Sequence, residues 1–124
     1  MVDKVKDVSG KVILDNKAKV RNKVKIHSST WNAIHHGMYL VANGPNSSIK
    51  SMFTNLKQTV AGKTGTAQLN TYHANHAYFM SYAPYKNPKI SVTCVIPNGY
   101  ASSNAVQTAR DVYKYYFSKN KKKV

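Results

Sequence analysis

Residues 60–68 read Val-Ala-Gly-Lys-Thr-Gly-Thr-Ala-Gln and are the most informative stretch of the chain. They are expected to form a strand, on which side chains alternate, so that Lys63 and Gly65 lie on one face and Thr64 and Thr66 on the other. Such a strand offers a cation, two hydroxyls and backbone N–H groups, a set that can bind a carboxylate and stabilise an oxyanion. Gly65 would let a ligand approach closely. The alternative is a polar edge strand whose lysine and threonines are only solvated.

This strand is expected to be followed by two more strands and a helix. Strands are predicted at residues 58–68, 76–82 and 90–96, and the short loops between them indicate an antiparallel meander. Ser102 is expected to cap a C-terminal helix. The apolar face of that helix is predicted to contain Ala105, Ala109, Val112 and Tyr116, widened by Val106, Tyr113 and Phe117.

The residues before the central strand predict a hairpin, an extended segment and a helix. Valines flank Ser9-Gly10 within residues 2–14, which is typical of a hairpin with a tight turn. Lysines alternate with apolar residues over residues 15–26, which indicates an exposed strand or an extended connection. A helix should begin at Ser28-Ser29-Thr30 and end at Asn43-Gly44-Pro45. Its apolar face is predicted to contain Trp31, Ile34, Met38 and Val41. We therefore predict an α+β fold, an antiparallel β-sheet flanked by α-helices.

The composition indicates one small domain or a piece of a larger one. The chain has 124 residues, and its hydrophobic fraction of 42% excludes a disordered chain. Its apolar runs are too short to span a bilayer, and we expect neither an export signal nor a membrane anchor in the sequence as given. The single cysteine, Cys94, excludes an internal disulfide framework and is expected to be a small core residue.

Basic residues dominate the chain, which has a formal net charge of +15 and no glutamate. This charge suggests an anionic partner, such as nucleic acid, an anionic envelope surface or an acidic remainder of a larger protein. Nucleic acid is the weaker candidate because only Arg21 and Arg110 are arginines, the side chains that most often contact guanine edges. The abundance of Lys, Asn and Tyr also fits an AT-rich coding sequence, which would raise the charge without any binding role.

The run Lys63-Thr64-Gly65-Thr66-Ala67-Gln68 resembles the third active-site motif of class B, high-molecular-weight penicillin-binding proteins. Further segments resemble the elements around that motif in the same family: residues 37–41, 77–79, 82–84 and 87–92. The resemblance covers roughly residues 26–117. It implies a partial β-lactamase/transpeptidase-like fold, divided into a basic hairpin and extended segment at 1–26, the C-terminal portion of a transpeptidase domain at 27–118, and a basic tail at 119–124.

The resemblance implies a role in a serine D,D-transpeptidase that cross-links peptidoglycan at the extracytoplasmic face of the bacterial membrane. Lys63 would lie beside the nucleophile and orient the carboxylate of the stem peptide or of a β-lactam. Thr64 and Thr66 would add hydroxyl contacts, and the Thr66 N–H would be one oxyanion-hole donor, with Gly65 completing the substrate-binding strand. The implied partners are the remainder of the parent domain, the stem peptide and β-lactams. No cofactor and no metal are expected.

The other two motifs of the family have no convincing copy. The nucleophile pattern Ser-x-x-Lys occurs at residues 47–50 and 118–121, and the pattern Ser-x-Asn at 102–104 and 118–120. The family order places both patterns before the lysine motif, and 47–50 is separated from that motif by only a short loop. We therefore expect the isolated chain to be inactive. Sheet edges without neighbours should also make it prone to self-association.

Other clusters of reactive residues are weak. His73 and His76 flank a turn without nearby Glu or Cys, which is a poor metal site, and His35 and His36 should point to different sides of their helix. Two other functions stay open beside the transpeptidase segment. One is a basic module that binds nucleic acid or an anionic envelope polymer, and the other is a penicillin-hydrolysing enzyme of the same superfamily.

Overall fold

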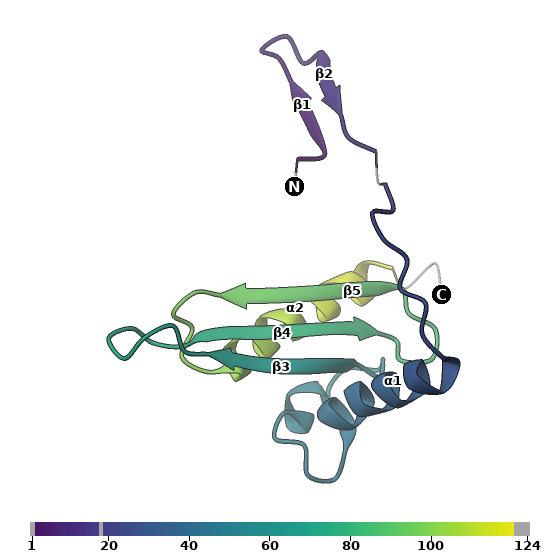
Figure 1. The fold of residues 1–124 in the computed structure, drawn as a ribbon, viewed down its shortest axis with the longest axis vertical. Helices are drawn as coiled ribbons and strands as arrows, with labels where there is room; N and C mark the ends of the chain where they lie inside the picture. Colours follow the sequence, from purple (N-terminus) through teal and green to yellow (C-terminus); the bar gives the residue numbers. More distant parts are fainter. Residues whose placement is uncertain (1, 18, 121–124) are drawn as a thin grey trace.

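The computed structural model describes residues 2–17 and 19–120. Its centre is a three-stranded antiparallel sheet in the order β3-β4-β5, formed by β3 (Ala61–Ala67), β4 (His76–Ala83) and β5 (Ile90–Ile96) (Figure 1). Each strand is joined to the next by a short loop. The predicted meander is confirmed, and so is the α+β fold with helices beside an antiparallel sheet.

Two helices pack on this sheet. Helix α2 (Ser102–Lys119) lies along one face and contacts all three strands, whereas α1 (Ser28–Asn43) contacts β3 (Figure 1). A short 3-10 helix, η1 (Lys50–Phe53), follows α1 and was not expected from the sequence. Helix α1 ends as predicted at Gly44, whose N–H donates to the Leu40 carbonyl at 2.8 Å.

The helix caps differ from the prediction. Ser102 is the first residue of α2 and does not cap it; Ala101 holds the cap position with extended backbone and no side-chain hydrogen bond. The side chain that secures this end is Asn104, whose amide donates to the Gly99 carbonyl at 2.8 Å. Asn104 thus ties the first turn to the preceding loop, and no side chain caps the N–H groups of this turn.

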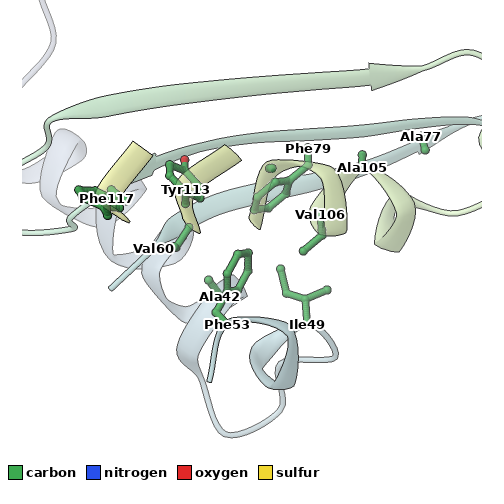
Figure 2. Close-up of a cluster of buried hydrophobic side chains, with 12 residues drawn as sticks. Ala42, Ile49, Phe53, Val60, Ala77, Phe79, Ala105, Val106, Tyr113 and Phe117 are labelled. Carbon is green, nitrogen blue, oxygen red and sulfur yellow. The ribbon is translucent and has the colours of Figure 1, made fainter. Parts of the chain in front are cut away.

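The hydrophobic core lies between the sheet, α2, η1 and the end of α1 (Figure 2). Its largest fully buried side chains are those of Val60, Phe79, Val106 and Tyr113. On α2 the buried positions recur every four residues at Ala105, Ala109, Tyr113 and Phe117, with Val106 beside them.

Two details of the predicted core are wrong. Val112 of α2 is 41% exposed because it lies at the edge of the buried stripe. On α1, Trp31 and Ile34 are 39% and 44% exposed, and only Ala42 is fully buried. Helix α1 packs mainly through its C-terminal end, against β3 and η1, so its first turns have little cover among the residues that the structure describes.

A polar pair lies inside this core. The hydroxyls of Ser81 and Tyr113 are 2.7 Å apart, and Ser81 also donates to the Val92 carbonyl at 3.2 Å. The Tyr113 hydroxyl therefore donates to Ser81. Burial raises the pKa of Tyr113, whereas a hydrogen bond that Ser81 donates to the ionised phenolate oxygen acts in the opposite direction.

The N-terminal hairpin forms as predicted, from β1 (Lys4–Lys6) and β2 (Val12–Asp15). Its turn contains Gly10 at a φ of 85°, and the Asp7 carboxylate accepts hydrogen bonds from Ser9 and Lys11. The Ser9 hydroxyl contributes most to lowering the pKa of Asp7. The residues between β2 and α1 form no helix or strand where they are described, so this segment is a connection rather than a strand. Across the described residues, no helix has the length and apolar character needed to cross a membrane.

Candidate functional site

Strand β3 leaves the core partway along its length. Val60, Ala61 and Gly62 are buried, whereas Lys63 is exposed. A Cβ on Gly62 would lie 2.6 Å from Cζ of Phe79 and 2.9 Å from the Met80 carbonyl oxygen. The first part of the predicted motif therefore anchors the strand in the core, and the second part presents it to solvent.

The register confirms the predicted alternation of side chains. Lys63 and Gly65 lie opposite Met80 and Tyr78, on the face away from α2. The two threonines, Thr64 and Thr66, lie opposite Phe79 and Ala77, which are fully buried under α2. Thr64 and Gly65 are half-buried, and Thr66 is exposed. The four residues that the sequence proposed as a site are therefore together on one short, accessible stretch.

Lys63 forms no ion pair with any acid among the described residues. Its ammonium donates to the Thr64 carbonyl at 2.6 Å, and the ion pairs found among the described residues are Lys4–Asp15 and Arg110–Asp111. In the described sheet β3 pairs with β4 alone, so no strand covers its other edge, which is open beyond the end that α1 contacts. The Thr64 carbonyl accepts this hydrogen bond from the solvent-exposed Lys63 side chain, so we place the carbonyl on this open edge. Backbone groups repeat their direction every two residues, so the Thr66 N–H faces the same edge.

A hollow of about 560 Å³ adjoins the strand. It is lined by Leu40, Val41, Gly44, Pro45, Asn46, Ser47, Ser48 and Thr64. Ser47, the first residue of one Ser-x-x-Lys match, donates its hydroxyl to the Val41 carbonyl at 2.6 Å and accepts the Ile49 N–H at 3.3 Å. This hydroxyl stabilises a turn, and its hydrogen-bond partners in the described chain include no base, which is not the arrangement of an activated nucleophile.

The other pattern matches also have local structural partners. Ser118 lies near the end of α2 and donates to the Tyr115 carbonyl at 2.8 Å; Lys121, which completes its Ser-x-x-Lys pattern, lies outside the described residues. His76 accepts the Asn98 N–H at 3.0 Å, and His73 lies 3.0 Å from the Asn70 side chain. Within residues 2–17 and 19–120, no group of three or more His, Cys, Asp or Glu side chains could hold a metal ion.

A series of aromatic rings joins α1 to the end of β4, and the sequence analysis missed it. The ring centroids of His35 and Tyr82 are 5.7 Å apart, and those of Tyr39 and Tyr85 are 4.9 Å apart. The Tyr82 hydroxyl is buried without a hydrogen-bond partner among the described atoms, and burial raises its pKa. Trp31, His35 and Tyr39 are spaced four residues apart in the sequence. On a helix this spacing places them on one face, so the sequence could have predicted the α1 part of this series.

Comparison with known families gives one broad match. The model described as "Penicillin binding protein transpeptidase domain" matches residues 1–114. The peptidoglycan D,D-transpeptidase MrdA of Haemophilus influenzae is 39% identical over 105 residues, which cover 73% of this chain and 16% of that protein. Penicillin-binding protein 2B of Streptococcus pneumoniae is 32% identical over 102 residues, covering 77% of this chain and 15% of that protein. The chain thus spans about one sixth of the length of these relatives.

Solved structures give the same result for the fold. The structure of penicillin-binding protein 2B from Streptococcus pneumoniae matches 92% of this chain and 20% of its own, with a TM-score of 0.71 and 28% identity. The crystal structure of Pseudomonas aeruginosa PBP2 in complex with WCK 5153 matches 88% of this chain and 24% of its own, with a TM-score of 0.70 and 27% identity. The hairpin, sheet and helices described above are therefore similar to part of a larger domain.

Proposed function

The chain belongs to the penicillin-binding protein transpeptidase family, and on that premise we propose that it supplies the lysine-bearing strand of a serine D,D-transpeptidase active site. The observation that carries this proposal is the position of Lys63 through Thr66 on the open edge of β3, with an ammonium that no acid neutralises in the described residues. The parent protein would cross-link peptidoglycan stem peptides and would bind β-lactams at the same place.

Each residue of the strand has a role that follows from its chemistry. Lys63 attracts the terminal carboxylate of a D-alanyl peptide, and the hydroxyls of Thr64 and Thr66 donate hydrogen bonds to it. The open edge lets the peptide backbone align as an added strand, with Gly65 leaving room for it. The Thr66 N–H points toward the place where the carbonyl oxygen gains negative charge during acylation, and it stabilises that charge.

The nucleophile is expected from another part of the parent protein. Ser47 holds a turn, and the remaining Ser-x-x-Lys match is at the end of α2. In the parent, a serine would attack the penultimate D-alanine carbonyl and release the terminal D-alanine, and an acceptor amine would then displace the serine. The partners of this chain are thus the rest of the domain, the stem peptide and β-lactams, at the extracytoplasmic face of the membrane.

Two measurements on the isolated chain test these roles. Intact-mass spectrometry after incubation with a fluorescent penicillin should show no covalent adduct; a stoichiometric adduct on any serine would contradict the assignment of the nucleophile to another segment. Amide chemical shifts recorded with a diacetylated Lys-D-Ala-D-Ala peptide should move at Thr64 to Thr66.

Matched controls separate carboxylate binding from general attraction. The chemical-shift changes should be smaller with the C-terminally amidated peptide, which lacks the carboxylate. They should also be smaller in Lys63→Met, which lacks the ammonium. Lys89→Met removes the same charge from an exposed position elsewhere and should leave the shifts unchanged. Equal shifts for Lys63→Met and the unmodified chain would reject the proposed role of Lys63.

A further inference from the structure

The connection between β2 and α1 has a regular charge pattern. Every odd-numbered position from 17 to 25 is basic, whereas no even-numbered position from 16 to 26 is. No acidic residue occurs between Asp15 and Asp111. An AT-rich coding sequence would raise the number of lysines but would not place them at every second residue, so composition alone does not explain the pattern.

Within this connection, residues 19–26 are exposed and make no hydrogen bond or ion pair with the rest of the described chain. Figure 1 shows the connection running from the hairpin to α1. Its apolar side chains are open to solvent: Val20 is 85% exposed, Val24 62% and Ile26 40%. The connection thus presents both cations and apolar groups that the rest of the described chain does not cover.

Extended backbone would separate these two kinds of side chain. Alternate residues of an extended chain point to opposite sides, so cations would recur about every 6.6 Å on one side, with valines on the other. A soluble linear polyanion would use the cations alone, and would favour aromatic side chains for stacking if it were a nucleic acid. Residues 19–26 contain no aromatic side chain.

An anionic bilayer uses both kinds of side chain at once. Lipid phosphates attract lysine and arginine, while apolar side chains enter the boundary between headgroups and acyl chains. We propose that residues 19–26 bind the surface of an anionic lipid bilayer, with Lys19, Arg21, Lys23 and Lys25 on the headgroup phosphates and Val20 and Val24 in the interface. This binding is independent of the β3 edge and goes beyond the proposed transpeptidase role.

Sedimentation of the full chain with vesicles tests the proposal. Vesicles of phosphatidylglycerol and phosphatidylcholine in equal parts should bind the chain, and vesicles of phosphatidylcholine alone should not. The double variant Lys19→Ser, Lys23→Ser should weaken binding roughly thirtyfold, because each basic residue near an anionic surface contributes about fivefold. Lys86→Ser, Lys89→Ser removes the same charge from the exposed turn before β5 and should cause a much smaller loss.

The apolar side chains give the deciding comparison. Val20→Ser, Val24→Ser keeps the net charge, and it should weaken vesicle binding while leaving binding to inorganic polyphosphate unchanged. If this variant binds vesicles as well as the unmodified chain does, the ligand is a linear polyanion or any anionic surface, and the proposal is overturned. It is also overturned if the two lysine variants lose equal affinity. Thermal unfolding of each variant checks that the core is intact.

Discussion

Replacement of Gly62 by alanine tests whether the motif strand owes its position to close packing on Phe79. The new Cβ would lie 2.6 and 2.7 Å from two ring carbons of Phe79 and 2.9 Å from the backbone oxygen of Met80. Phe79 is fully buried, and the Phe53 ring lies behind it at a centroid distance of 6.1 Å. Neither the ring nor the carbonyl can move away without disturbing the core or the β3–β4 pairing.

The expected cost of Gly62→Ala is about 2 kcal/mol of unfolding free energy, within the range for overpacking a close-packed core. Gly65→Ala is the matched control on the same strand. Its Cβ would lie 3.3 Å from Cβ of the half-buried Tyr78, a tight contact that a small shift relieves. The reduced entropy of the unfolded chain offsets part of that contact, so the control should change stability by less than about 1 kcal/mol.

Urea unfolding followed by far-ultraviolet circular dichroism measures both variants. The transition midpoint should fall for Gly62→Ala and stay near the unmodified value for Gly65→Ala, with unchanged slopes. A Gly62→Ala chain as stable as the unmodified one would refute the packing argument. If both variants lost the same unfolding free energy, β3 would tolerate no side chain at either glycine. The contact with Phe79 would then not explain the loss in Gly62→Ala.

Three further outcomes are expected. Tyr113→Phe should cost about 1 kcal/mol at neutral pH, because the hydrogen bond to Ser81 is lost. Because burial raises the pKa of Tyr113, the tyrosine of the unfolded chain loses its proton at a lower pH than the tyrosine of the folded chain. The unfolding free energy of the unmodified chain should therefore fall as the pH rises above about 10. Chemical denaturation at several pH values should show that the difference in unfolding free energy between the unmodified chain and Tyr113→Phe becomes smaller there. The open edges of β3 and β5 should favour self-association that strengthens with salt, as lysine repulsion is screened, and light scattering that shows a monomer at every salt concentration would contradict this. Binding to duplex DNA should be weak, independent of sequence and steeply salt-dependent in fluorescence anisotropy, and tight sequence-selective binding would favour the nucleic-acid alternative.

Local sequence signals were sufficient for the strands and for the end of α1. Proline and glycine follow Ile96 and stop β5 at the predicted residue, and Gly44 ends α1 because its successor is proline. The alternation of Lys63 and Thr64 was also predictable, since it follows from strand geometry alone. Each of these features depends on neighbours a few residues away in the chain.

Features that depend on distant residues were not predictable in the same way. The exposure of Trp31 follows from how α1 crosses β3, and a helical wheel contains no information about that crossing. The pairing of Tyr39 with Tyr85 joins residues that are far apart in sequence. The bond from the Asn104 amide to the Gly99 carbonyl at the start of α2 depends on the path of the preceding loop.

The candidate site and the core share one strand, and this links their properties. The Asn43 side chain at the end of α1 donates to the Val60 carbonyl at 2.8 Å and to the Tyr39 carbonyl at 2.9 Å. Val60 and Gly62 are buried immediately before the exposed Lys63. The position of the Lys63 backbone is therefore set by the buried contacts of Val60 and Gly62, and the Lys63 ammonium bonds to the Thr64 carbonyl rather than to an acid. A lysine on a strand held in this way keeps its place while its charge stays available to a carboxylate, which the proposed binding at this edge requires.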